Sequence, residues 1–158
     1  MLFGAVSVSN DYCEASREMI YRYFERRMQN DELAALIQPR QPFRAGLLRP
    51  WDCRGMIHAF RDLEELSRPI TDVEPDGKGL PILLRQYAKV GGKLLAFNVD
   101  RKFSNVLDGL VVVDLRQTEE AVLDKYMGRE AAVKFRRFHR LAYSHGETSA
   151  LISPVAVE

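Results

Sequence analysis

Segment 72–115 carries the clearest local pattern in the chain, and this pattern predicts a loop, a helix and two strands in that order. Its entry, residues 75–79, is rich in proline and glycine, which disfavour regular structure. Pro81 then stands where a first helical residue tolerates a missing N–H, and apolar residues recur at helical spacing after it. Gly91 and Gly92 end the predicted helix, because glycine adopts a left-handed cap conformation without strain.

The two predicted strands of this segment are residues 93–99 and 109–115, which are rich in aliphatic and β-branched residues. The polar connection between them, 100–104, is short, so we expect the strands to be antiparallel neighbours, with Asp108 as a turn residue before the second strand. Residues 2–8 predict a further strand. The fold class is therefore expected to be α/β or α+β, with a small, mainly antiparallel sheet flanked by helices.

Further helices are predicted on both sides of this segment. Asp11 and Glu14 have the spacing of a capping pair for a helix that ends near Arg27. Other helical segments are predicted at 31–37, 62–66, 119–127 and 129–143. The proline-rich residues 38–52 predict an irregular segment, which is either a flap over a site or a plain surface excursion.

The last predicted helix is amphipathic and basic. Its apolar face is expected to hold Ala131, Phe135, Phe138 and Ala142, and its opposite face Arg129, Arg136, Arg137 and Arg140. Such a helix can lie on an anionic membrane, meet an acidic carrier protein, or pack as an ordinary surface helix.

Composition excludes several classes of function. A net charge of +1 gives no argument for nucleic-acid binding. The cysteines Cys13 and Cys53 are expected to be free thiols in a reducing cytoplasm. No Cys or His spacing indicates a metal site, and no Gly-x-Ser-x-Gly frames a nucleophilic serine. We therefore expect a cytoplasmic protein without a metal, with peripheral attachment to the inner membrane as an alternative.

The pattern of segment 72–115 resembles the C-terminal half of hemolysin-like, GNAT-related bacterial N-acyltransferases, a family similar to ornithine-lipid N-acyltransferases and acyl-homoserine-lactone synthases. The family's Gly-(Ile/Leu/Val)-Pro-x-Leu-Leu-(Arg/Lys)-x-Tyr helix is matched by 79–87, which continues into Lys89, Val90 and Gly91. Its Phe-(Asn/Ser)-x-x-x-Asp turn is matched by Phe103, Ser104 and Asp108. Residues 2–9 resemble the strand after the family's cofactor-binding helix.

This resemblance implies transfer of a fatty acyl group from an acyl-carrier-protein or coenzyme A thioester to an amine acceptor in lipid metabolism. The donor is then a substrate, and no tightly bound cofactor is expected. An amine that attacks a thioester needs a base for its proton and donors for the oxyanion. The expected catalytic residues are Glu74 and Asp76, which could act as the base or bind the amine of the acceptor. The expected substrate-binding residues are Ser7, Ser9, Lys78 and Asp108. Loop capping or surface charge explains each of them equally well.

One element of the family is not matched. The family's pyrophosphate-binding turn lies before the strand matched by residues 2–9, and the lone Gly77-Lys78-Gly79 is a weak signal for such a turn. Residues 1–117 are therefore expected to form the C-terminal half of an acyltransferase domain, followed by a helical extension at 118–143 and a tail at 144–158. A separate N-terminal half is the expected partner. The alternative is a catalytically inert half-domain that binds a partner or a membrane surface.

Overall fold

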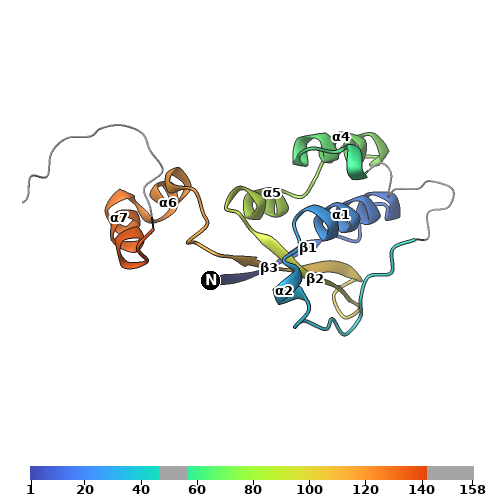
Figure 1. The fold of residues 1–158 in the computed structure, drawn as a ribbon. Coiled ribbons are helices and arrows are strands. Elements are labelled where there is room, and N and C mark those ends of the chain that lie inside the picture. Colours follow the sequence, from blue (N-terminus) through green and yellow to red (C-terminus); the bar gives the residue numbers. More distant parts are fainter. Residues whose placement is uncertain (47–56, 142–158) are drawn as a thin grey trace, which may run out of the picture. The chain divides into compact units, whose positions relative to one another are not determined.

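The computed structural model describes residues 1–46 and 57–141 (Figure 1). The chain divides into two compact units, Met1–Glu119 and the segment from Glu120 onward. Residues 47–52 of the predicted irregular segment, the end of the predicted last helix and the predicted tail lie outside the described residues.

The sheet of the first unit is antiparallel throughout. It consists of β1 (Leu2–Val8), β2 (Lys93–Asp100) and β3 (Val106–Val113), in the order β1-β3-β2. A mixed α/β fold with a small antiparallel sheet is thus confirmed. Both outer strands pair with the central β3, so β1 lies at one edge.

Strand β3 begins three residues earlier than the sequence pattern predicts. The turn is made by Ser104 and Asn105, whose φ angles are 52° and 54°. The prediction that Asp108 is a turn residue is therefore wrong. Asp108 lies within β3, opposite Ser7 of β1 and Asn98 of β2.

The helices of the first unit are α1 (Glu14–Arg27), α2 (Asp31–Ala34), α4 (Leu63–Val73) and α5 (Ile82–Lys89). Figure 1 shows α1, α4 and α5 on the same side of the sheet. The core lies between these helices and the strands, and its fully buried residues include Val8, Ile20, Leu66, Ile70, Leu84 and Leu107. Burial of this apolar surface is the main force that holds helices and sheet together.

Helix α4 continues to Val73, although the predicted helical segment stopped at Leu66. Pro69 lies inside it and cannot donate a main-chain hydrogen bond. Leu66 and Ile70, on either side of this proline, are both fully buried. Packing against the core therefore outweighs the local cost of the proline.

The described part of the predicted irregular segment is attached to β2. The N–H of Gln41 donates to the Asn98 side chain at 2.8 Å, and the N–H of Val99 donates to the Gln41 carbonyl at 2.8 Å. An isolated bridge joins Pro42 to Asn98. Residues 41 and 42 thus extend the sheet locally beyond its second edge.

The second unit contains α6 (Glu120–Met127) and α7 (Arg129–Phe138), separated by Gly128 at φ 81°. The predicted faces of the last helix are wrong: Ala132 and Arg136 are its buried residues, whereas Phe138 is 82 % exposed. Arg136 lies 3.8 Å from the Glu120 carboxylate, and this ion pair compensates its burial. Among the residues that the structure describes, no helix has the length and apolar character of a membrane span.

Candidate functional site

The side chain of Glu74 links the end of α4 to the start of α1. Its side chain is fully buried, and its Oε1 accepts a hydrogen bond of 2.9 Å from the main-chain N–H of Cys13. Cys13 is the N-cap residue of α1 and makes no capping bond with its own side chain. Glu74 therefore supplies the cap that the sequence pattern assigned to Asp11, and that assignment is wrong.

The environment of Glu74 keeps its carboxyl ionised. Burial acts to raise its pKa, but hydrogen bonding from Ser16 and Cys13 and the charge of Lys78 act in the opposite direction and prevail, so that the pKa is lowered. A negative charge at the first turn of α1 is also favoured by the helix dipole. Glu74 thus places a fixed carboxylate beside residues 76–78.

The ammonium group of Lys78 is surrounded by oxygen atoms. It lies 3.5 Å from Oε2 of Glu74 and 3.3 Å from Oδ2 of Asp76, and it donates to the main-chain carbonyl of Asp11 at 3.0 Å. It also lies 4.7 Å from the ring centroid of Tyr12, a cation–π distance. Together the Glu74 and Asp76 carboxylates, the Asp11 carbonyl and the Tyr12 ring form an ammonium cage, which the protein's own Lys78 occupies.

The pKa values of the cage favour cation binding over proton abstraction. The N–H of Lys78 donates to the exposed carboxylate of Asp76 at 3.2 Å, and this bond is the main cause that lowers the pKa of Asp76. Burial acts to lower the pKa of Lys78, yet its ion pairs with Asp76 and Glu74 outweigh burial and raise it. A carboxylate with a lowered pKa is a weak base at neutral pH. The role of Glu74 and Asp76 as catalytic bases therefore stays a prediction, and the geometry gives more support to their binding role.

Two residues of the cage, Asp11 and Tyr12, were missed by the sequence analysis. The hydroxyl of Tyr12 donates to the Gly79 carbonyl at 2.8 Å, and burial is the main cause that raises its pKa. These contacts join residues 67 positions apart, and no local pattern signals them. Asp11 and Tyr12 reach Lys78 and Gly79 only because the segment before α1 packs against the 74–79 loop in the folded chain.

The predicted serines fall into separate groups. The hydroxyl of Ser9 donates to the Asp11 carboxylate at 2.9 Å, so Ser9 adjoins the ammonium cage through Asp11. The hydroxyl of Ser7 donates instead to Asp108 on the neighbouring strand. Ser7 and Asp108 thus satisfy each other, and no contact described in the structure joins them to Lys78.

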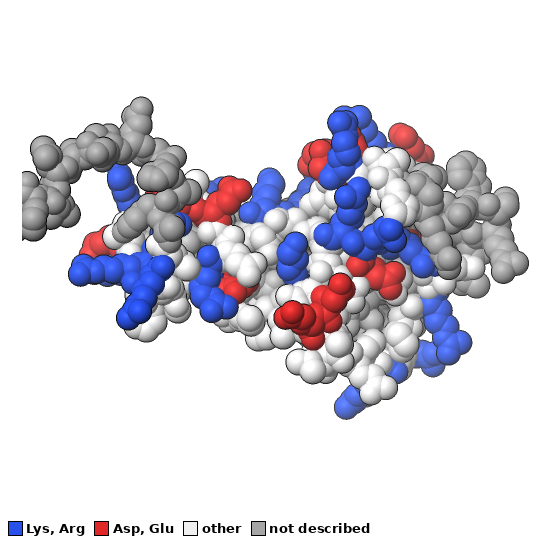
Figure 2. All heavy atoms as spheres, in the orientation of Figure 1, with Lys and Arg blue, Asp and Glu red and all other residues white. Residues whose placement is uncertain are grey.

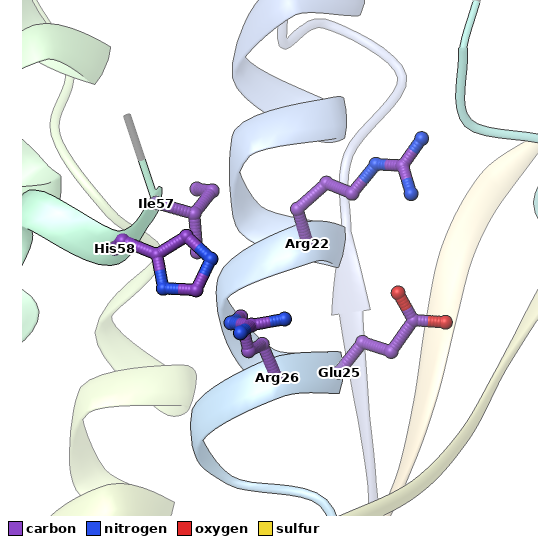
Figure 3. A pocket seen from close by; sticks show the side chains of 5 residues that line it. All are labelled: Arg22, Glu25, Arg26, Ile57 and His58. Carbon is purple, nitrogen blue, oxygen red and sulfur yellow. The ribbon is translucent and has the colours of Figure 1, made fainter. Parts of the chain in front are cut away.

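A hollow of about 330 Å³ lies elsewhere, beside α1 (Figure 3). Its lining residues are Arg22, Glu25, Arg26, Ile57 and His58. A neighbouring hollow shares three of these residues and adds Arg27. None of the predicted site residues lines either hollow.

Comparison of the chain with protein families, with curated proteins and with solved structures finds no match. Within residues 1–46 and 57–141, no group of three or more His, Cys, Asp or Glu side chains is placed to hold a metal ion. The chemistry of the site must therefore be argued from the ammonium cage itself.

Proposed function

We propose that this chain takes part in acyl transfer from an acyl-carrier-protein or coenzyme A thioester to an amine, and that the ammonium cage binds the acceptor. The observation that carries this proposal is the position of the Lys78 ammonium between the carboxylates of Glu74 and Asp76. A pocket that holds an ammonium group of its own has the charges and the hydrogen-bond acceptors to hold one from a substrate.

An amino-acid acceptor suits the cage better than a simple amine. Such a zwitterion carries an ammonium and a carboxylate a few bonds apart, and Asp76 and Lys78 offer the opposite pair of charges. The Asp76 side chain is 61 % exposed and the Lys78 side chain 27 % exposed, so both can be reached from solvent. The substrate's ammonium then binds to Asp76 and its carboxylate to Lys78, while buried Glu74 keeps Lys78 in place.

The acyl-transfer step requires a neutral amine. The acceptor ammonium loses a proton and the neutral nitrogen attacks the thioester carbonyl. The C–S bond then breaks, the thiolate leaves with its electron pair, and a second proton passes from the nitrogen to the thiolate, which gives an amide and a free thiol. Because Glu74 and Asp76 have lowered pKa values, we assign neither of them as the base: Asp76 orients the amine, Glu74 holds Lys78, and the proton of the ammonium passes to water. Orientation alone can supply a large part of the rate enhancement.

The resemblance of segment 72–115 to GNAT-related acyltransferases supports the same proposal. The described order β1, α1, α2, α4, α5, β2 and β3 is compatible with part of a GNAT-like fold, and the cage includes residues between β1 and α1. The donor is expected to bind on another surface, which a partner half would supply.

The test is a mass-spectrometric screen of the full-length gene product with acyl-carrier-protein and acyl–coenzyme A donors. Each donor is offered basic and neutral amino acids and, as matched acceptors, the same amines without the α-carboxylate. The proposal predicts N-acylated amino acids and little product from the decarboxylated amines. Equal transfer to both sets would contradict acceptor binding at the cage, and no transfer to any amine would contradict the enzymatic proposal.

The edge position of β1 favours a second candidate, a partner-binding module without activity of its own. Leu2 and Phe3 on this strand are 55 % and 63 % exposed, and the strand pairs only with β3 among the described residues. An exposed apolar edge strand can accept a strand from another chain. Light scattering at high protein concentration should then detect association that Phe3→Lys reduces and Phe103→Lys, at an exposed turn residue, does not. A monodisperse monomer in all three proteins would contradict this candidate.

A further inference from the structure

The hollow beside α1, which we call the α1 pocket, has an excess of positive charge. Among the described residues that line it and the neighbouring hollow are Arg22, Arg26 and Arg27 and one carboxylate, Glu25, while Glu18 pairs with Arg22 from outside this lining. Figure 2 shows Lys and Arg side chains gathered along α1. With a volume of about 330 Å³, the pocket has the size of a site for a small ligand.

The pocket is built from two segments distant in the sequence. Arg27 donates to the main-chain carbonyls of His58 at 3.3 Å and Phe60 at 3.1 Å, and so it fixes the 58–60 segment against α1. Ile57, beside it, is buried in the core. In Figure 3, His58 stands on one side of Arg26, and Arg22 and Glu25 extend on the other side.

The arginines of the pocket have N–H donors that no described protein group accepts. In the part of the chain that the structure describes, Nε of Arg22 is buried without a hydrogen-bond partner, and its only ion pair, with Glu18, is long at 3.4 Å. Arg26 is exposed and has no ion pair or hydrogen bond within the same residues. A guanidinium group offers a planar fork of donors that fits a phosphoryl or carboxylate group.

The carboxylate of Glu25, from the described lining, already accepts a hydrogen bond. Oε1 of Glu25 accepts a hydrogen bond of 2.8 Å from the hydroxyl of Tyr21. Burial, together with this bond, raises the pKa of Tyr21 to about 12, so the hydroxyl remains a donor across the physiological range. Within the described residues, Glu25 forms no ion pair with Arg22 or Arg26, and the acidic partner of Arg22 is Glu18.

We propose that the α1 pocket binds a phosphate-bearing ligand, with Arg22 and Arg26 as its donors and His58 at its rim. A phosphoryl group offers the two guanidinium groups more acceptor oxygens than a carboxylate does. The site is independent of the acyl-transfer proposal, because no residue of the ammonium cage lines it. The competing explanation is structural: Arg26 and Arg27 favour the C-terminal end of α1 through the helix dipole, and Arg22 only pairs with Glu18.

Amide NMR spectra test this assignment during titration with inorganic phosphate and, separately, with glycerol 3-phosphate at constant ionic strength. Saturable shifts confined to the amides around 22–27 and 57–60 are expected with at least one of them. Tighter binding of inorganic phosphate would identify a free anion as the ligand, and tighter binding of glycerol 3-phosphate would identify an organic phosphate.

Variants then separate the α1 pocket from general charge attraction. Arg26→Ala should weaken binding about tenfold, since a charge-assisted hydrogen bond is lost. Arg101→Ala removes an exposed arginine at the β2–β3 turn and should leave binding unchanged. Absence of saturation at millimolar phosphate, or equal weakening by both variants, would overturn the proposal.

Discussion

The carboxylate of Glu74 caps helix α1 through the main-chain N–H of Cys13, 61 positions earlier in the sequence. The same side chain faces the ammonium of Lys78 with its other oxygen. One buried residue thus fixes both the start of α1 and the loop that carries the candidate site. Stability and site geometry are coupled through this contact.

Replacement of Glu74 should cost more stability than replacement of an exposed acid. Glu74→Ala leaves the Cys13 N–H without its acceptor and Lys78 without a partner, and we expect a loss of about 2 kcal/mol in the free energy of unfolding. Urea denaturation measures this loss. Glu64 pairs with Arg85 but is 70 % exposed, so Glu64→Ala is the matched control and should cost less than about 0.5 kcal/mol. Equal losses in both variants would contradict the capping role.

The ion pair of Asp114 and Arg116 predicts a stability change in acid. The side-chain hydrogen bond from Arg116 is the largest of the causes that lower the pKa of Asp114 from 3.8 to about 2. Because this folded-state pKa lies below the unfolded value, the contribution to stability is complete above pH 3.8 and is lost as the pH falls toward about 2. Urea denaturation at each pH should show that Asp114→Asn reduces the slope in this range.

A second variant checks the origin of this pH dependence. Arg116→Gln removes the guanidinium but keeps the main-chain N–H that donates to Asp114 at 3.1 Å, so it should reduce the slope less than Asp114→Asn does. The double variant should have the slope of Asp114→Asn. An unaltered slope in either single variant would assign the acid sensitivity to other carboxyl groups.

Gly79 is required by a close approach rather than by backbone strain. A Cβ at this position would lie 2.5 Å from Oγ of Ser67, which accepts the Leu80 N–H at 3.0 Å. Gly79→Ala must therefore displace Ser67, and we expect it to destabilise the protein by about 1–3 kcal/mol in thermal or urea unfolding. Adding Ser67→Ala to Gly79→Ala removes the clashing hydroxyl. The additional loss of unfolding free energy should therefore be smaller than the loss that Ser67→Ala causes in the unchanged protein. Full additivity of the two changes would show that they do not interact.

The fold was predictable where local rules act. The glycines at 91 and 128, with φ angles of 79° and 81°, end helices as expected, and β2 begins at Lys93 as predicted. Helix α4 departs from the local rule because Pro69 lies between two core residues, and only the core explains its length. The faces of α7 were predicted wrongly because the charged Arg136, with Glu120 as its ion-pair partner, is buried, whereas the apolar Phe138 is exposed.

The candidate site was predictable only in part. A resemblance identified Glu74, Asp76 and Lys78, and the structure brings these three side chains together. Asp11 and Tyr12 come from the other side of the ammonium cage, and their contacts depend on tertiary packing that no sequence motif encodes. Ser7 and Asp108 are partners across two strands, a relation set by register.

The central claim is that the Asp76 carboxylate of the ammonium cage binds the acceptor amine and does not act as a base. Steady-state kinetics of amine acylation for Asp76→Asn tests it most directly, with Asp72→Asn, at an exposed acid near the end of α4, as the control. We predict that Asp76→Asn raises KM for an amino-acid acceptor about tenfold and changes kcat little. A fall in kcat of about 100-fold or more at unchanged KM would show a catalytic base instead and would contradict the account.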